Sequence, residues 1–98
     1  MDEHGRRPFD DWLGAMRDQR AKARILVRLD RLAAGLTGDA KSVGDGVWEL
    51  RIPEGQGYRV YFGWIGQAAV LLLCGGGKDS QSRDIANAKE FWSQYHGR

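Results

Sequence analysis

The sequence has few of the residues that build disulfide frameworks, metal centres and membrane anchors. It contains one cysteine, Cys74, and two histidines, His4 and His96, so no disulfide can form within one chain and no cluster has the spacing of a metal site. The longest apolar run, AAVLLLC at 68–74, is far too short to cross a bilayer, and the polar N-terminus does not resemble a signal peptide. These absences predict a cytoplasmic protein that has no membrane contact, metal or cofactor.

The length and the charge distribution set further limits. A chain of 98 residues with 42% hydrophobic and 29% charged residues predicts one soluble globular domain over 1–98, with residues 1–8 frayed. The net charge of +2 says little about partners, but residues 17–31 hold six basic residues against two acidic ones. Such a stretch is typical of a solvated helix face, and it also suits contact with nucleic acid or an acidic protein.

Helical periodicity occurs in three segments. Apolar residues at 9, 12, 13 and 16 follow the spacing of one helix face, and Pro8 suits the first turn of that helix. A second amphipathic stretch runs from about 21 to 32 or 34 and is followed by Gly35, and a third runs from about 80 to 95. Because only a few residues near 18–20 separate the first two segments, we expect an antiparallel helical hairpin.

Between the second and third helical segments, the sequence alternates with the period of β-strands. VWELRI (47–52) and YRVYFGW (58–64) place large apolar residues on one face, and AAVLLLC is apolar on both. GDAKSVGDG (38–46) has the composition of a turn. The order predicts an α+β domain with an N-terminal helical hairpin, a three-to-four-stranded antiparallel meander and a C-terminal helix. We expect the helices on one face of the sheet, and the last strand either central or covered by helices.

The opposite face of the first two strands carries polar residues that suit a phosphodiester. Glu49, Arg51, Arg59 and Tyr61 share this face, and the short turn makes Arg51 and Arg59 cross-strand neighbours. Arginine binds phosphate oxygens bidentately, and tyrosine can transfer a proton or stack on a base. After the last strand, GGGK holds Lys78 near the sheet edge, where it could help to bind an anion. Arg–Glu pairing on a solvated sheet face is the simpler alternative.

The longer sequence pattern resembles a known family. The run VGDGVWELRIPEGQGYRVYF, followed by LLLCGGGKDSQSRDI and preceded by FDDWL and ARILVRLDRLAAG, resembles the RelE/ParE superfamily of bacterial toxins. Within it, the chain is most similar to the HigB-like addiction module killer proteins, which are related to the phage Gp49-like family. The resemblance covers residues 9–95. It implies a RelE/ParE-like fold and a toxin of a type II toxin–antitoxin system, and many such toxins are endoribonucleases that cut messenger RNA on the ribosome.

The resemblance also implies roles for individual residues. The arginine of the GYR strand is functional in the ribonuclease members, and here it is Arg59. Basic residues on the preceding strand also act, and this chain has Glu49 and Arg51 there. The implied catalytic set is Arg59, Arg51, Tyr61, Glu49 and Lys78. The implied RNA-binding set is Lys41, Arg51, Arg59, Lys78 and Gln81.

RNA cleavage by attack of a 2′-hydroxyl on the adjacent phosphate needs a base, positive charge at the phosphorane oxygens, and an acid for the leaving 5′-oxygen. We expect Arg59 and Arg51 to stabilise the charge and Lys78 to contact the phosphate. Glu49 or Tyr61 is the expected base, and the acid stays unassigned.

The partners implied by the resemblance are a helix-turn-helix (HigA-like) antitoxin, messenger RNA and the ribosome. DNA would be contacted only through the antitoxin, which binds the operator of its own genes. Two alternatives stay open at this point. One is a non-enzymatic toxin of the ParE type, which inhibits DNA gyrase. The other is an inactive phage-accessory relative that kept only the fold.

Overall fold

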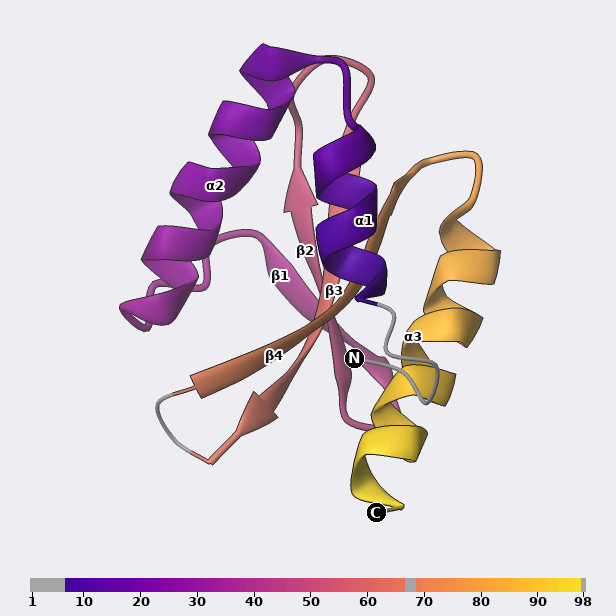
Figure 1. The fold of residues 1–98 in the computed structure, drawn as a ribbon. Helices are drawn as coiled ribbons and strands as arrows, with labels where there is room; N and C mark the ends of the chain where they lie inside the picture. The colour runs from indigo at the N-terminus through magenta and orange to yellow at the C-terminus, as the bar shows by residue number, and fades with distance from the viewer. Residues whose placement is uncertain (1–6, 67–68, 98) are drawn as a thin grey trace.

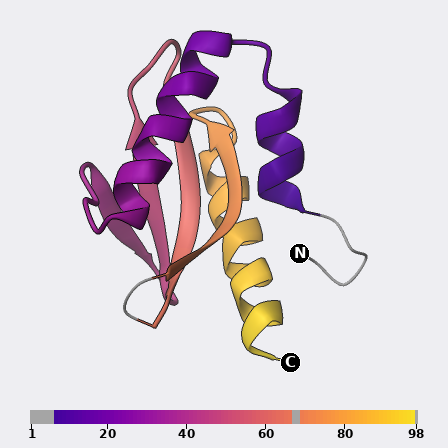
Figure 2. The same ribbon diagram turned by 60° about the vertical axis from the view of Figure 1, so that its left-hand side comes forward.

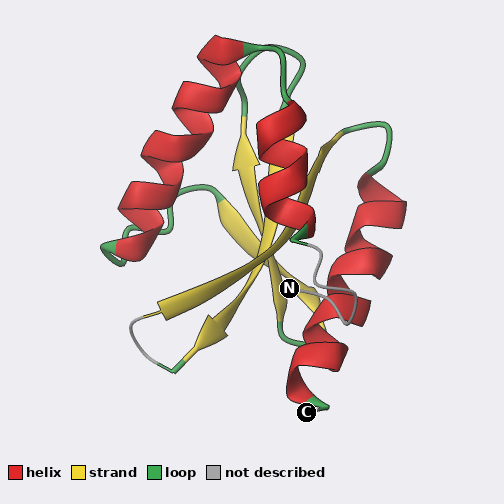
Figure 3. Ribbon diagram, in the orientation of Figure 1, coloured by secondary structure: helices red, strands yellow, loops and turns green. Residues whose placement is uncertain are grey.

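The computed structural model describes residues 7–66 and 69–97, so the predicted fraying of residues 1–8 lies almost entirely outside the described residues. Two helices, α1 (Pro8–Ala15) and α2 (Gln19–Ala33), come first. Four strands follow: β1 (Ala40–Gly44), β2 (Val47–Ile52), β3 (Tyr58–Ile65) and β4 (Ala69–Gly77). The chain then forms α3 (Gln81–His96). Figures 1 and 3 show this α+β arrangement, which confirms the predicted fold class.

The four strands form one antiparallel sheet in the order β1-β2-β3-β4. β1 lies within the segment that was predicted to be a turn, so that prediction was wrong. Only the end of the segment turns: Asp45 and Gly46 both have positive φ and join β1 to β2 as a tight hairpin. The glycines and the aspartate of this turn concealed the short strand before it. β4 lies at the other edge of the sheet, and both α1 and α3 pack against it, so the expected alternative of a strand covered by helices is confirmed.

The first two helices cover one face of the sheet. They run in opposite directions, with α1 against β4 and α2 against β2 (Figure 1). The N-cap Asp18 starts α2 by accepting a hydrogen bond from the backbone N–H of Ala21 at 3.1 Å. Apolar side chains of both helices meet those of the strands in the larger core, whose fully enclosed members include Ile25, Leu32, Leu50, Ile52, Val60 and Phe62. The predicted inward set of β2 and β3 is therefore confirmed.

The third helix covers the opposite face, so the expectation that all helices pack on one face was wrong. Figure 2 shows α2 and α3 on opposite sides of the sheet. A second core cluster of Val47, Tyr61, Leu73, Cys74 and Ala88 lies beneath α3. Gly63 makes this contact possible, because a Cβ atom there would lie 2.3 Å from the ring of Trp92. The middle of β3 is consequently buried on both faces.

None of the helices in the described part of the chain has the length and hydrophobicity needed to span a bilayer.

Candidate functional site

Arg51 and Arg59 lie directly opposite each other on β2 and β3. Two like charges in this register repel each other, and each needs a compensating group. Arg51 donates to one carboxylate oxygen of Asp39 from Nε at 3.2 Å and from Nη2 at 3.0 Å, at a position where both side chains are about half exposed. Arg59 is more enclosed and pairs with Glu49, with Nε 3.6 Å from Oε2. Arg51 and Arg59 together present two guanidinium groups at the end of the sheet.

Lys78 joins the two arginines around one cleft of about 410 Å³. The cleft is lined by Asp39, Arg51, Ile52, Pro53, Gly57, Tyr58, Arg59 and Lys78. The loop after β4 brings the lysine there, because the end of β4 pairs with the start of β3. Three of the residues that the sequence singled out for phosphate contact therefore converge on one concave, basic surface.

Glu49 forms the centre of a buried polar cluster behind this cleft. Its side chain is 0% exposed, as is that of Tyr61. One carboxylate oxygen, Oε2, accepts hydrogen bonds from the Tyr61 hydroxyl and from Nε2 of Gln81, both at 3.0 Å. The second oxygen, Oε1, has no hydrogen-bond partner among the described residues. The same oxygen that pairs with Arg59 is thus held by two neutral donors.

Burial raises the pKa of the Tyr61 phenol above its ordinary value, and the hydrogen bond to Glu49 raises it further. The phenol therefore stays protonated to a higher pH than an exposed tyrosine, and its hydroxyl donates a hydrogen bond to Glu49.

These positions correct the expectation that Glu49 and Tyr61 face solvent or a ligand. Packing of α3 encloses both, and neither lines the cleft. Gln81, the first residue of α3, is partly buried and reaches Glu49 instead of the cleft. Lys41 is exposed on β1 opposite Glu49, outside the residues that line the cleft. Of the predicted site residues, the structure therefore gathers Arg51, Arg59 and Lys78 at the surface, and Glu49, Tyr61 and Gln81 beneath it.

Among the residues that line the cleft without having been assigned to it from the sequence, Tyr58 and Asp39 carry polar side chains. Tyr58 is partly buried, and its ring packs edge-on against Trp12 with centroids 6.3 Å apart. The alternation of β3 places Tyr58 on the core face of the sheet. Tyr58 is the first residue of the strand, however, and there the face is only partly buried. Asp39 precedes β1, and the register that pairs Ala40 with Leu50 brings it beside Arg51. Because β1 was not predicted, no sequence signal placed this carboxylate.

Cys74, the single cysteine, lies on β4 beneath α3, away from the cleft. Its thiol donates to the backbone carbonyl of Asp84 at 3.5 Å, and burial raises its pKa to about 12. This confirms the prediction of a small buried hydrophobe. Within residues 7–66 and 69–97, no three histidine, cysteine, aspartate or glutamate side chains are grouped to hold a metal ion.

Comparison with known proteins gives a family and one relative. The family described as "Phage derived protein Gp49-like (DUF891)" matches residues 11–91. An uncharacterized protein of Haemophilus influenzae (strain ATCC 51907 / DSM 11121 / KW20 / Rd) is 54% identical over 81 residues, which span 83% of this chain and 82% of that protein. No solved structure matches the chain significantly. The chain thus belongs to the Gp49-like family of phage-derived proteins, a family associated with toxin–antitoxin addiction modules.

Proposed function

We propose that this protein is the toxin of a type II toxin–antitoxin system and that it cleaves messenger RNA on the ribosome. Membership of the Gp49-like family supports the toxin role. The observation that carries the nuclease role is the convergence of Arg51, Arg59 and Lys78 on one cleft. Asp39 and Glu49 each offset one of the two arginines, but three basic side chains and only one carboxylate line the cleft itself. This excess of positive charge suits an anionic ligand such as a phosphate.

The proposed reaction is a transesterification within the RNA strand. The 2′-oxygen forms a bond to the adjacent phosphorus, its proton passes to solvent, and the bond from phosphorus to the 5′-oxygen breaks. The 5′-oxygen takes up a proton, so the products end in a 2′,3′-cyclic phosphate and a 5′-hydroxyl. Arg51 and Arg59 stabilise the negative charge that develops on the phosphorane oxygens, and Lys78 holds the phosphate.

The enclosed residues receive a different role from the one that the sequence suggested. Glu49 and Tyr61 do not reach the cleft, so we assign them to positioning instead of proton transfer. Glu49 forms an ion pair with Arg59 at 3.6 Å, without a hydrogen bond to its Nε, and the Tyr61 hydroxyl donates a hydrogen bond to Glu49 at 3.0 Å. Tyr58 lines the cleft itself, and its hydroxyl is our candidate for the proton donor to the 5′-oxygen.

The proposed partner is a helix-turn-helix antitoxin that neutralises the toxin and binds the operator. A neighbouring reading frame with a helix-turn-helix pattern would support this assignment without bench work. The reaction itself is tested by brief expression of the chain from a tight promoter, with transcript 5′ ends mapped by primer extension. The comparison is with Arg59→Ala and with Arg83→Ala, an exposed arginine on α3 that does not line the cleft.

We expect new cuts within translated regions for the parent chain and for Arg83→Ala, and none for Arg59→Ala. Growth arrest with intact transcripts and a DNA-damage response would contradict the nuclease and support a gyrase-directed toxin. If expression causes no growth arrest and no transcript cuts, both toxin mechanisms are contradicted.

A further inference from the structure

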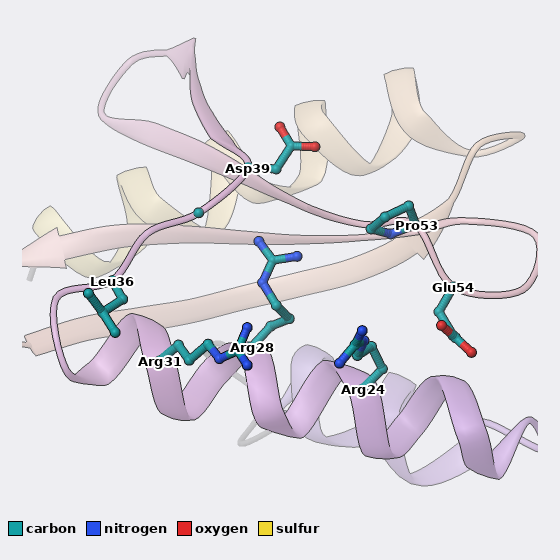
Figure 4. A pocket seen from close by; sticks show the side chains of 8 residues that line it. Arg24, Arg28, Arg31, Leu36, Asp39, Pro53 and Glu54 are labelled. Carbon is teal, nitrogen blue, oxygen red and sulfur yellow. The ribbon is translucent and has the colours of Figure 1, made fainter.

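A second hollow of about 530 Å³ adjoins the basic cleft. One wall is the face of α2 that carries Arg24, Arg28 and Arg31, and the other is formed by residues before β1 and after β2 (Figure 4). The full lining is Arg24, Arg28, Arg31, Leu36, Gly38, Asp39, Pro53 and Glu54. We call this hollow the α2 groove. The basic stretch that the sequence showed at 17–31 is thus partly directed into a concave surface.

The arginines of the α2 groove differ in how firmly they are held. Arg28 is anchored: its Nη1 donates to the carbonyl oxygen of Arg51 at 3.0 Å, and its Nη2 is buried without a hydrogen-bond partner among the described residues. Arg24 and Arg31 are exposed on either side of it, and neither forms an ion pair within residues 7–66 and 69–97. The groove therefore offers one hydrogen-bonded and two solvent-exposed positive charges.

The α2 groove and the cleft form a continuous surface. Asp39 and Pro53 line both hollows. The hydrogen bond from Arg28 to the backbone of Arg51 joins α2 to the strand whose side chain enters the cleft. Together the two hollows contain six basic side chains and two carboxylates, one of which is already paired with Arg51. A polyanion that enters the cleft meets further positive charge as it continues along this path.

We propose that the α2 groove binds the phosphate backbone of the RNA nucleotides that flank the scissile phosphate. This inference rests on the proposed nuclease function, because it takes the strand in the cleft to be RNA. Arginine suits the task, since its planar guanidinium binds phosphate oxygens bidentately and without base preference. Continuity with the cleft favours RNA over an acidic polypeptide, because a strand held at Arg59 must leave the cleft along its walls.

The test measures binding without cleavage. Fluorescence anisotropy follows 2′-O-methyl oligoribonucleotides, which lack the attacking hydroxyl, at several salt concentrations. A trinucleotide fills the cleft alone, and a decanucleotide reaches the groove. Arg24→Ala/Arg31→Ala removes the two exposed groove charges. Arg20→Ala/Arg83→Ala removes two exposed charges outside both hollows and serves as the matched control.

The parent chain and the control should bind the decanucleotide more tightly than the trinucleotide. The groove variant should lose this gain, keep its affinity for the trinucleotide, and lower the slope of log affinity against log salt by about 1.4, or roughly 0.7 for each lost phosphate contact. Equal binding of the decanucleotide by the groove variant and the control would overturn the proposal.

Two other results separate the proposals from each other. If the groove variant binds RNA normally but loses binding of poly-glutamate that the control retains, the groove serves an acidic polypeptide and the RNA proposal is overturned. If the groove variant loses the gain in affinity for the decanucleotide but no transcript is cut in cells, the α2 groove binds RNA and the proposed nuclease activity is rejected. Thermal unfolding of each variant confirms that its fold is intact.

Discussion

The carboxylate of Glu49 on β2 lies 3.6 Å from the guanidinium Nε of Arg59 on β3, in a cluster that α3 covers. The carboxylate is fully enclosed, whereas the arginine retains partial exposure at the cleft. A buried charge that loses its partner is strongly destabilising, so the two residues act as a unit. The exposed part of Arg59 is the part available to substrate, and Glu49 is the group that holds it.

Removal of Glu49 should therefore affect both stability and cleavage. We expect Glu49→Ala to lower the free energy of unfolding by about 3 kcal/mol, because Arg59 is left without its carboxylate. Glu49→Gln should be milder in urea unfolding but should still reduce the rate constant of RNA cleavage more than substrate affinity. Because Arg59→Ala abolishes cleavage, the coupling is measured by urea unfolding: in an Arg59→Ala background, Glu49→Gln should change the free energy of unfolding by less than it does in the parent. Additive losses of stability would instead mean that the two side chains do not act as a unit.

The Tyr61 phenol gives the protein a specific sensitivity to high pH. Its pKa lies above the unfolded value of 10.0, so the unfolded chain loses this proton first as the pH rises. The contribution to stability is complete below pH 10 and declines above it, by about 1.4 kcal/mol for each pH unit until the folded pKa is reached. Tyr61→Phe should flatten this decline in urea unfolding at high pH. An unchanged pH dependence would show that Tyr61 is not the group responsible.

The contributions of the Tyr58 ring and of its hydroxyl can be tested separately with Tyr58→Phe, which keeps the ring. If its hydroxyl donates the proton to the leaving 5′-oxygen, Tyr58→Phe should lower the cleavage rate by about 100-fold, at the lower end of general acid catalysis, with RNA affinity unchanged. The ring stays in place against Trp12, so thermal unfolding should match that of the parent. Full activity of Tyr58→Phe would show that the Tyr58 hydroxyl is not the proton donor.

Cys74 should be unreactive in the folded protein. Burial keeps the thiol protonated, with a pKa of about 12, and thiolate is the form that attacks disulfide reagents. Modification by a chromogenic disulfide reagent should therefore proceed at the rate of unfolding and should accelerate in urea. Rapid stoichiometric modification in buffer would show that the β4–α3 packing opens easily.

The sequence predicted the elements of the fold because each has a clear periodicity. It allowed for a fourth strand but did not place one at β1, whose last residue, Gly44, is followed directly by Asp45 and Gly46 of the hairpin turn. Alternation along β2 and β3 separated the two faces correctly, but it carries no information about what covers each face. Glu49 and Tyr61 were consequently expected to face solvent or a ligand, although α3 buries them.

The pairing of Arg51 with Arg59 was predicted for a different reason. Antiparallel register across a short turn places Arg51 beside Arg59, and the turn length is visible in the sequence. Asp39 and the arginines of α2 reach the same region only through long-range packing, as shown by the hydrogen bond from Arg28 to the carbonyl of Arg51. Contacts of this kind leave no local pattern.

The nuclease proposal is tested directly by cleavage of messenger RNA by the purified protein on translating ribosomes. Parent, Arg59→Ala and Arg83→Ala proteins are compared, and the ends of the products are analysed chemically. We expect fragments with 2′,3′-cyclic phosphate and 5′-hydroxyl ends from the parent and from Arg83→Ala, and intact RNA with Arg59→Ala. Equal cleavage by Arg59→Ala, or intact RNA with a folded parent protein, would contradict the nuclease proposal.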